Sequence, residues 1–122
     1  MPPKKFLIVD DEQGIVDEIK SFFTEEGFEV FIADTAKDGI DLVKAIKPDI
    51  LFLDMKLPDA SGIIVLQASK EYSPFTKVIV STGYVDQHLI DEAERLGRDA
   101  FLPKPFNLLM LKDEVDKLFS SI

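Results

Sequence analysis

Four groups of residues that could take part in chemistry each follow a short apolar run of this 122-residue chain: Asp10-Asp11 after residues 6–9, Asp54 after 50–53, Ser81-Thr82 after 78–80, and Lys104 after 100–102. If the fold brings the three carboxylates together, they repel one another unless a cation lies among them. Oxygen ligands in a small site favour Mg²⁺, with Mn²⁺ as the alternative. A hydroxyl and a lysine opposite that metal would complete the surroundings of a phosphoryl group.

Among the three carboxylates, Asp54 is the best candidate nucleophile. It stands alone at the end of its apolar run, whereas Asp10 and Asp11 are adjacent in the sequence. Attack of a carboxylate on phosphorus gives an acyl phosphate. The residue types therefore predict phosphoryl transfer to Asp54, with Thr82 and Lys104 beside the transferred group.

The positions of these residues depend on five apolar runs that alternate with five amphipathic stretches. The runs at 6–9, 30–33, 50–53, 78–80 and 100–102 predict strands, and the stretches at 15–23, 36–46, 63–70, 89–96 and 108–118 repeat apolar residues at helical spacing. Strict alternation of strand and helix predicts an α/β fold: a doubly wound, five-stranded parallel sheet with helices on both faces.

The apolar pattern also predicts the strand order. The first, third and fourth runs are apolar throughout, as expected of strands that are covered on both faces. The second and fifth runs have Glu29 and Asp99 at their ends, so we expect them at the edges of the sheet. The order 2-1-3-4-5 follows. In such sheets ligands bind beyond the carboxyl ends of the strands, where the order reverses, and Asp10, Asp11 and Asp54 end the two strands at that point.

Turn-forming residues mark the ends of the predicted helices. Gly27 and Gly97 are predicted to close the first and fourth helices. Either Asp34 or Thr35 is expected to cap the start of the second helix, and Pro48 to follow its end.

Composition places the chain among globular proteins and excludes several classes of function. Hydrophobic residues make up 46% and charged residues 30% of the chain, which is typical of one folded domain; we expect it to span residues 5–122, after a flexible N-terminus at 1–4. The absence of cysteine excludes disulfides and thiolate metal sites. The apolar runs are too short to cross a membrane or to act as a signal peptide, so a cytoplasmic location is the default expectation. The net charge of −9 argues against direct binding of nucleic acid by this domain, and solubility is its simplest explanation.

Each candidate residue also has a simpler interpretation when it is considered alone. Asp11 or Thr82 could be a helix N-cap, which is a common role for Asp and Thr after a strand. Asp54 could equally be a turn residue. A single Lys104 would usually be a solvated surface charge. It is their joint placement at the carboxyl ends of strands that favours a functional site.

The sequence around these residues resembles a known family. The motifs are Val9-Asp10-Asp11-Glu12, residues 53–58 (Leu-Asp-Met-Lys-Leu-Pro) with Gly62, Ser81-Thr82-Gly83, and residues 101–106 (Phe-Leu-Pro-Lys-Pro-Phe). Four such motifs in this order, over essentially the whole chain, resemble the CheY-like receiver domain of two-component response regulators. The resemblance implies a signalling phosphoacceptor that catalyses only its own phosphorylation and dephosphorylation, rather than an enzyme acting on other substrates.

The resemblance also implies a role for each acidic position. Asp54 would accept the phosphoryl group from a phosphohistidine on a sensor histidine kinase or a phosphotransfer protein. Asp11 would ligate Mg²⁺ directly, Asp10 would act partly through water, and the backbone carbonyl of Lys56 would be a further ligand.

Residues on the last two strands would read the phosphorylation state. By resemblance, Thr82 donates its hydroxyl to the phosphoryl group, Lys104 pairs with a phosphoryl oxygen, and the Lys104-Pro105 peptide bond is cis. Phe101 stands at the aromatic switch position and would turn inward as Thr82 moves. The face made by the fourth helix, fifth strand and fifth helix would then bind a downstream protein or an output domain missing from this chain. It could also form a phosphorylation-dependent homodimer.

A few positions depart from the commoner family pattern. Gly83 replaces an alanine, and Phe101 replaces a tyrosine, so the switch lacks a hydroxyl. Lys56 and Tyr84 flank the site at variable positions and are expected to tune the lifetime of the acyl phosphate. His88, the single histidine, is expected to be an exposed helix residue rather than a phosphotransfer site.

Three other functions are open at this point. A phosphatase with an aspartate nucleophile would place it after the first strand with an acid two residues later, but Asp54 is followed by Met55-Lys56. A flavodoxin-like FMN carrier needs a phosphate-binding loop after the first strand, where this chain has acidic residues. The third is a receiver-shaped module that signals without phosphorylation. Only a chemical test of phosphorylation can distinguish it from a phosphoacceptor.

Overall fold

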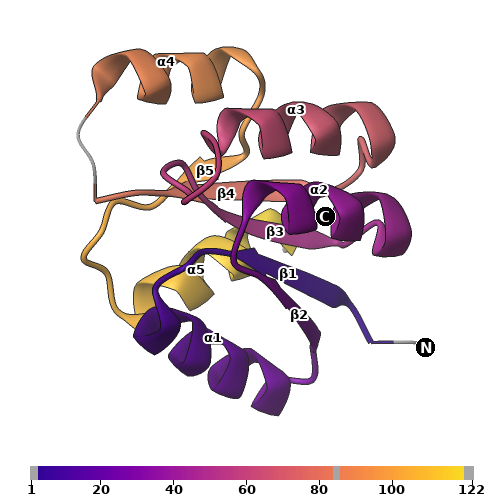
Figure 1. Ribbon diagram of the computed structural model, residues 1–122. Coiled ribbons are helices and arrows are strands. Elements are labelled where there is room, and N and C mark those ends of the chain that lie inside the picture. Colours follow the sequence, from indigo (N-terminus) through magenta and orange to yellow (C-terminus); the bar gives the residue numbers. More distant parts are fainter. Residues whose placement is uncertain (1–2, 84–85, 120–122) are drawn as a thin grey trace.

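The architecture follows strict alternation of strand and helix in a computed structural model that describes residues 3–83 and 86–119 (Figure 1). In chain order the elements are β1 (Lys5–Val9), α1 (Gln13–Glu25), β2 (Glu29–Ala33), α2 (Ala36–Ile46), β3 (Ile50–Asp54), α3 (Ile63–Tyr72), β4 (Lys77–Ser81), α4 (Gln87–Arg95), β5 (Ala100–Phe101) and α5 (Leu108–Phe119). Each predicted run and stretch corresponds to one of these elements. The predicted α/β class is therefore confirmed.

The five strands form one parallel sheet in the order β2-β1-β3-β4-β5. This confirms the predicted order, with β2 and β5 at the edges. The register aligns Val9 with Leu53, and Asp54 with Ser81. The polar residues that end or follow β1, β3 and β4 therefore lie at the same edge of the sheet.

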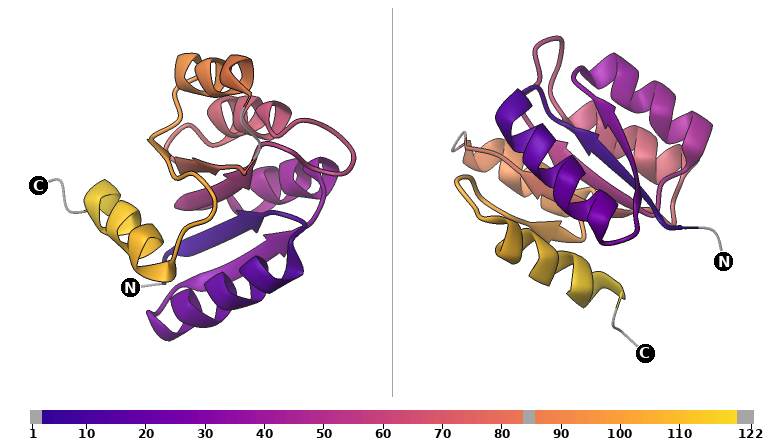
Figure 2. Two further views of the ribbon diagram at one scale, coloured as in Figure 1. Left: turned by 90° about the vertical axis from the view of Figure 1, so that its left-hand side faces the viewer. Right: turned by 90° about the horizontal axis from the view of Figure 1, so that it is seen from below.

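Two layers of helices cover the sheet. Helices α1 and α5 lie on one face, and α2, α3 and α4 lie on the other (Figure 2). Alternate side chains of the central strands feed the two cores: Leu7 and Val9 pack on the side of α2 and α3, while Phe6 and Ile8 pack on the side of α1 and α5. All four side chains are fully buried, which explains why the strand sequences are apolar without alternation.

The helix ends are set largely by the residues expected to set them. Thr35 is the cap of α2, because its hydroxyl accepts a hydrogen bond from the Asp38 backbone N–H at 3.1 Å. Gly27 and Gly97 follow α1 and α4 with φ of 97° and 92°, a backbone conformation that glycine adopts most readily. Helix α2 ends one residue before Lys47, which precedes Pro48 and has φ of 46°.

Strand β5 is shorter than the predicted run 100–102. The Leu102 N–H still donates to the Val80 carbonyl at 2.8 Å, although the strand itself ends at Phe101. The chain then turns, and the Lys104 N–H donates to the Thr82 carbonyl at 3.1 Å. This turn directs Lys104 toward the carboxyl ends of β1 and β3.

At the start of the chain, backbone pairing reaches the residue before β1. The Lys4 carbonyl accepts a hydrogen bond from the Glu29 N–H at 2.9 Å. The flexible segment 1–4 and the domain bounds 5–122 stay predictions, since Met1 and Pro2 fall outside the described residues. Within the part of the chain that the structure describes, no helix is both long and apolar enough to span a bilayer.

Candidate functional site

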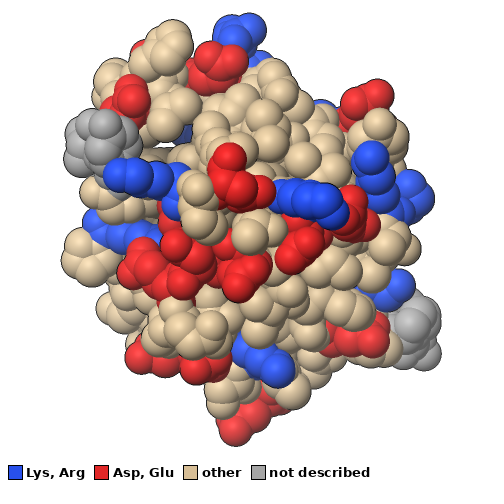
Figure 3. Space-filling model, in the orientation of Figure 1, with Lys and Arg blue, Asp and Glu red and all other residues tan. Residues whose placement is uncertain are grey.

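An open cleft of about 430 Å³ lies at the carboxyl ends of the strands. Its walls come from the loops after β1, β3 and β4, and they include Asp11, Glu12, Asp54, Lys56 and Thr82. The cleft therefore lies where the strand order reverses, as the sequence predicts. Acidic side chains gather across the middle of the face seen in Figure 3, with basic side chains beside them.

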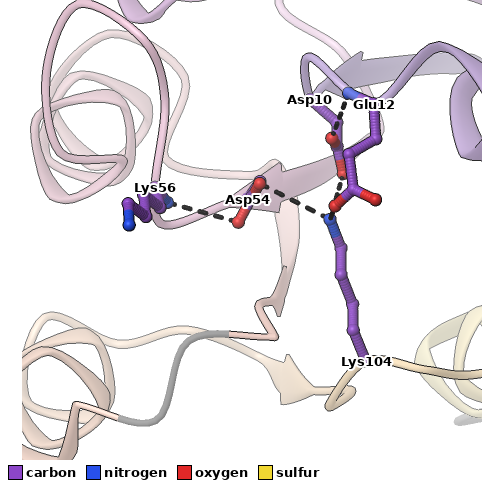
Figure 4. Close-up of polar contacts among 5 residues, drawn as sticks. All are labelled: Asp10, Glu12, Asp54, Lys56 and Lys104. Atoms are coloured by element: carbon purple, nitrogen blue, oxygen red, sulfur yellow. Dashed lines mark hydrogen bonds and ion pairs between the residues drawn. The ribbon is translucent and has the colours of Figure 1, made fainter.

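At the cleft, the Lys104 ammonium lies among three carboxylates (Figure 4). Its Nζ is 2.6 Å from Glu12 Oε1, 2.8 Å from Asp10 Oδ2 and 3.4 Å from Asp54 Oδ2. The side chains of Lys104, Asp10 and Asp54 are nearly inaccessible to water, whereas that of Glu12 is 55% exposed. One positively charged ammonium thus faces three carboxylates.

This crowding perturbs the ionisation of both Asp54 and Lys104. Burial raises the pKa of Asp54 above its usual range, although Lys104 and a backbone hydrogen bond from Lys56 oppose that shift. Burial alone would lower the pKa of Lys104, but hydrogen bonds from its ammonium to Asp10 and Glu12 hold the pKa above its usual range. Lys104 therefore stays charged at neutral pH, while the charged form of Asp54 is disfavoured.

The loop after β3 fixes the position of Asp54. The Lys56 N–H donates to Asp54 Oδ1 at 3.2 Å, and the Gly62 N–H donates to the Met55 carbonyl at 2.8 Å. Lys56 and Ser61 form an antiparallel bridge, so the loop folds back on itself. Gly62 passes so close to the backbone of Asp54 and Met55 that a Cβ there would overlap it. A glycine is needed to hold this loop against Asp54.

The turn after β1 positions the other buried acid. The Asp10 N–H continues the sheet by donating to the Ala33 carbonyl at 3.1 Å. The Asp10 carboxylate accepts a hydrogen bond from the Glu12 N–H at 2.9 Å, which folds the chain into α1. Asp10 is therefore held by two hydrogen bonds, one from its backbone N–H to β2 and one to its carboxylate from the turn that follows.

The carboxylates fit the predicted divalent metal. Oxygens of Asp10, Glu12 and Asp54 lie within 4.8 Å of one another, and an all-oxygen donor set of this charge suits Mg²⁺ or Mn²⁺. Asp11, the expected direct ligand, is exposed and lines the cleft, but its carboxylate is not part of this cluster. The sequence-based site did not include Glu12, although it is the third acid in the run that contains Asp10 and Asp11.

The two predicted switch residues lie on neighbouring strands, β4 and β5, or directly after them. Thr82 is buried at the end of β4 and lines the cleft. Phe101 is half-buried and packs against the core on the side of α2 and α3, with the Arg98 guanidinium 5.8 Å from its ring centre. The Lys104-Pro105 peptide bond is cis.

Two other predicted positions do not belong to this cluster. His88 is highly exposed on α4, 3.9 Å from Glu92, which agrees with its interpretation as a surface residue. Tyr84, expected to tune the lifetime of the acyl phosphate, lies outside the described residues.

Comparison with known proteins identifies the family of this chain. The sequence model of the response regulator receiver domain matches residues 6–116. The chain is 35% identical over 117 residues to the sporulation initiation phosphotransferase F of Bacillus subtilis (strain 168), covering 96% of this chain and 94% of that protein. It is 32% identical to the regulatory protein AtoC of Escherichia coli (strain K12), covering 85% of this chain but 23% of that protein.

A solved structure gives the same result for the fold. The CheY-like response regulator receiver domain protein of Methanospirillum hungatei JF-1 superposes with a TM-score of 0.93 at 32% identity, covering 97% of this chain and 94% of that one. Sequence and structure thus agree over nearly the full length. The chain belongs to the response regulator receiver domain family of two-component signal transduction.

Proposed function

We propose that Asp54 is the phosphoacceptor of this receiver domain and that it takes its phosphoryl group from a phosphohistidine. The observation that carries the proposal is the placement of Asp54 in the cleft wall, with Lys104 Nζ 3.4 Å from its carboxylate. A buried carboxylate beside a fixed cation, open to a cleft on one side, is suited to attack an incoming phosphorus.

The transfer exchanges one bond to phosphorus for another. An Asp54 carboxylate oxygen forms a bond to phosphorus, the P–N bond to the donor histidine breaks, and the imidazole leaves with the bonding electron pair and takes up a proton. Lys104 and the Thr82 hydroxyl bind oxygens of the transferred group. Mg²⁺, held by Asp10, Asp11, Asp54 and the Lys56 carbonyl, supplies charge neutralisation when bound.

Phosphorylation would alter the face formed by α4, β5 and α5. The new phosphoryl oxygens attract Thr82 and Lys104, whose loops are joined by the hydrogen bond from the Lys104 N–H to the Thr82 carbonyl. Movement of Thr82 would make room for Phe101, which is half-buried in the unphosphorylated protein, to turn further inward.

The proposed partners lie on both sides of this step. A sensor histidine kinase or a phosphotransfer protein supplies the phosphoryl group, and a downstream protein or an output domain reads the altered face. AtoC is much longer than the matched region, which supports an output domain as the reader of this face. The sporulation phosphotransferase is similar in length to this chain, which supports a separate downstream protein. A phosphorylation-dependent homodimer through the same face is a further possibility to test.

Incubation with acetyl phosphate and Mg²⁺, followed by intact mass spectrometry, tests the proposal directly. We expect a single phosphoryl adduct that requires the metal, is released by hydroxylamine, and is absent in Asp54→Asn. Asp99→Asn, which alters an acid at the opposite end of the sheet, is the matched control and should label as the wild type does.

Two other outcomes would contradict the proposal. Failure to label while Mg²⁺ and a cognate phosphohistidine are both present would favour a module that signals without phosphorylation. Rapid turnover of p-nitrophenyl phosphate would favour an aspartate-nucleophile phosphatase.

A further inference from the structure

Glu12 makes the shortest contact with Lys104, although it takes no part in the phosphoryl transfer proposed for Asp54. The distance from Lys104 Nζ is 2.6 Å to Glu12, compared with 3.4 Å to Asp54. Glu12 is the N-cap residue of α1, yet its side chain makes no capping hydrogen bond to the helix. The contact with Lys104 is therefore not a by-product of helix capping.

The three contacts of Lys104 differ in how easily they can be given up. An ammonium has three N–H donors, and three carboxylates occupy them here. A phosphoryl group on Asp54 brings new anionic oxygens, so Lys104 must release one of its present partners to reach them. Asp10 is buried and would lose its cation without gaining water, whereas Glu12 is 55% exposed and water can replace the lysine.

We propose that Glu12 is a positioning residue that holds Lys104 on the α1 side of the cleft in the unphosphorylated protein and competes with the incoming anion for it. The proposal rests on the proposed function, since it assumes that Lys104 binds the phosphoryl group on Asp54. Glu12 thus sets the fraction of molecules in which Lys104 is available to bind the anion. Once Asp54 is phosphorylated, Lys104 exchanges Glu12 for a phosphoryl oxygen.

The expected effect is modest because the ion pair is partly solvated. Exposed pairs of this kind change equilibria by roughly two- to five-fold. Glu12→Gln should therefore strengthen binding of beryllofluoride, a stable mimic of the phosphoryl group on aspartate, by about three-fold. Removal of any negative charge near an anion site also strengthens anion binding. The test must therefore separate the effect of the contact between Glu12 and Lys104 from the effect of the charge alone.

Two variants make that separation. Glu12→Asp keeps the charge but is one methylene shorter, so its carboxylate withdraws from Lys104. Lys104→Ala removes the group that Glu12 is proposed to position, so a double-mutant cycle isolates the pairwise effect. Glu25→Gln, at the far end of α1, makes the same change in net charge at an exposed position and serves as the control.

The experiment is calorimetric titration of the full chain with beryllofluoride at saturating Mg²⁺, with thermal unfolding to check that every variant is folded. We expect tighter binding for Glu12→Gln and for Glu12→Asp, no change for Glu25→Gln, and no effect of Glu12→Gln once Lys104 is alanine. NMR of the Lys104 side chain, without metal or anion, should also show its Cε signal shifted in Glu12→Gln.

The results that overturn the proposal are distinct from failure of the proposed function. Wild-type affinity in Glu12→Gln, wild-type behaviour of Glu12→Asp, or an effect of Glu12→Gln that persists in Lys104→Ala would each overturn the positioning role alone. In those cases the wild type would still bind beryllofluoride and Asp54→Asn would not. No binding by the wild type, or equal binding by Asp54→Asn, would overturn both.

Discussion

The two ends of the sheet use carboxylates in opposite ways. At the amino end, the Asp49 carboxylate accepts the Lys5 backbone N–H at 2.7 Å, and the Asp99 carboxylate accepts the Val78 backbone N–H at 2.8 Å. At the carboxyl end, Asp10 and Asp54 are more deeply buried and share one lysine with Glu12.

This difference separates acids that stabilise the fold from acids that are placed for the proposed chemistry. Backbone N–H groups at the amino end give each carboxylate a partner of its own, which favours the folded state. Three carboxylates around one ammonium leave excess negative charge at the carboxyl end, which opposes folding and attracts a metal. Changes at the amino end should therefore affect stability alone, whereas changes at the carboxyl end should also affect phosphorylation, and loss of the Asp54 carboxylate there should raise stability.

The largest effect is expected from Gly62→Ala, which alters both stability and chemistry at the carboxyl end. The added Cβ would lie against the Asp54 carbonyl oxygen and 2.8 Å from the Met55 Cα. Because backbone must move, we expect a loss of about 3 kcal/mol in the free energy of unfolding. Labelling of displaced Asp54 by acetyl phosphate should slow by on the order of ten-fold or more.

Urea unfolding and the labelling rate measure these two effects. The control is Gly14→Ala in α1, where the added methyl group would meet no atom within 4 Å and stability should rise by about 0.5 kcal/mol. Normal labelling of a stable Gly62→Ala protein would show that the loop tolerates a side chain.

At the amino end, Thr76→Val should lower stability without affecting phosphorylation. The Thr76 hydroxyl donates to the Pro48 carbonyl at 2.5 Å and lies 2.6 Å from the Ser73 hydroxyl, and Ser73 and Thr76 are both buried. Loss of the hydroxyl leaves these groups unpaired, at a cost of about 2 kcal/mol in urea unfolding. Ser69→Ala is the control, because the buried Ser69 hydroxyl has no hydrogen-bond partner within the described residues. Equal losses in the two variants would argue against a specific role of this network.

Mg²⁺ should stabilise the protein through the carboxyl end alone. At ten times its dissociation constant, the metal raises the free energy of unfolding by about 1.4 kcal/mol by mass action. The expected rise in unfolding temperature should disappear with EDTA and in Asp10→Asn, because that variant removes a buried charge of the cluster. Asp99→Asn should keep the effect, and a loss in both variants would mean that the ion does not act at the predicted site.

The sequence was sufficient to predict the sheet and the position of the cleft, for physical reasons. Runs buried on both faces must be apolar, and parallel strands bring the residues after their carboxyl ends to one edge. Asp10, Asp54, Thr82 and Lys104 were therefore predictable as neighbours. Phosphoacceptor and ligand roles remain predictions.

The finer geometry of the site was less accessible to sequence reasoning. Among three consecutive acids, the turn in which the Glu12 N–H bonds Asp10 Oδ1 decides which carboxylate reaches Lys104, and neither residue type nor spacing reveals it. The end of β5 was also not predicted: the strand stops at Phe101, although the Leu102 N–H still bonds the Val80 carbonyl.

The smallest effect is a gain in stability when the buried Asp54 carboxylate is replaced. Because burial raises the pKa of Asp54, the folded state favours its protonated form. The resulting contribution to stability is present in full below pH 3.8, the unperturbed value, and is lost as the pH rises through the folded pKa. Asp54→Asn should therefore raise the free energy of unfolding at pH 7 by about 1 kcal/mol, and urea titrations should show the gain narrowing toward pH 4. Asp99→Asn should show no such gain, because Asp99 has a backbone partner of its own. A loss of stability in Asp54→Asn at pH 7 would mean that Lys104 depends on Asp54 more than on Asp10 and Glu12, and the contrast between the two ends of the sheet would not hold.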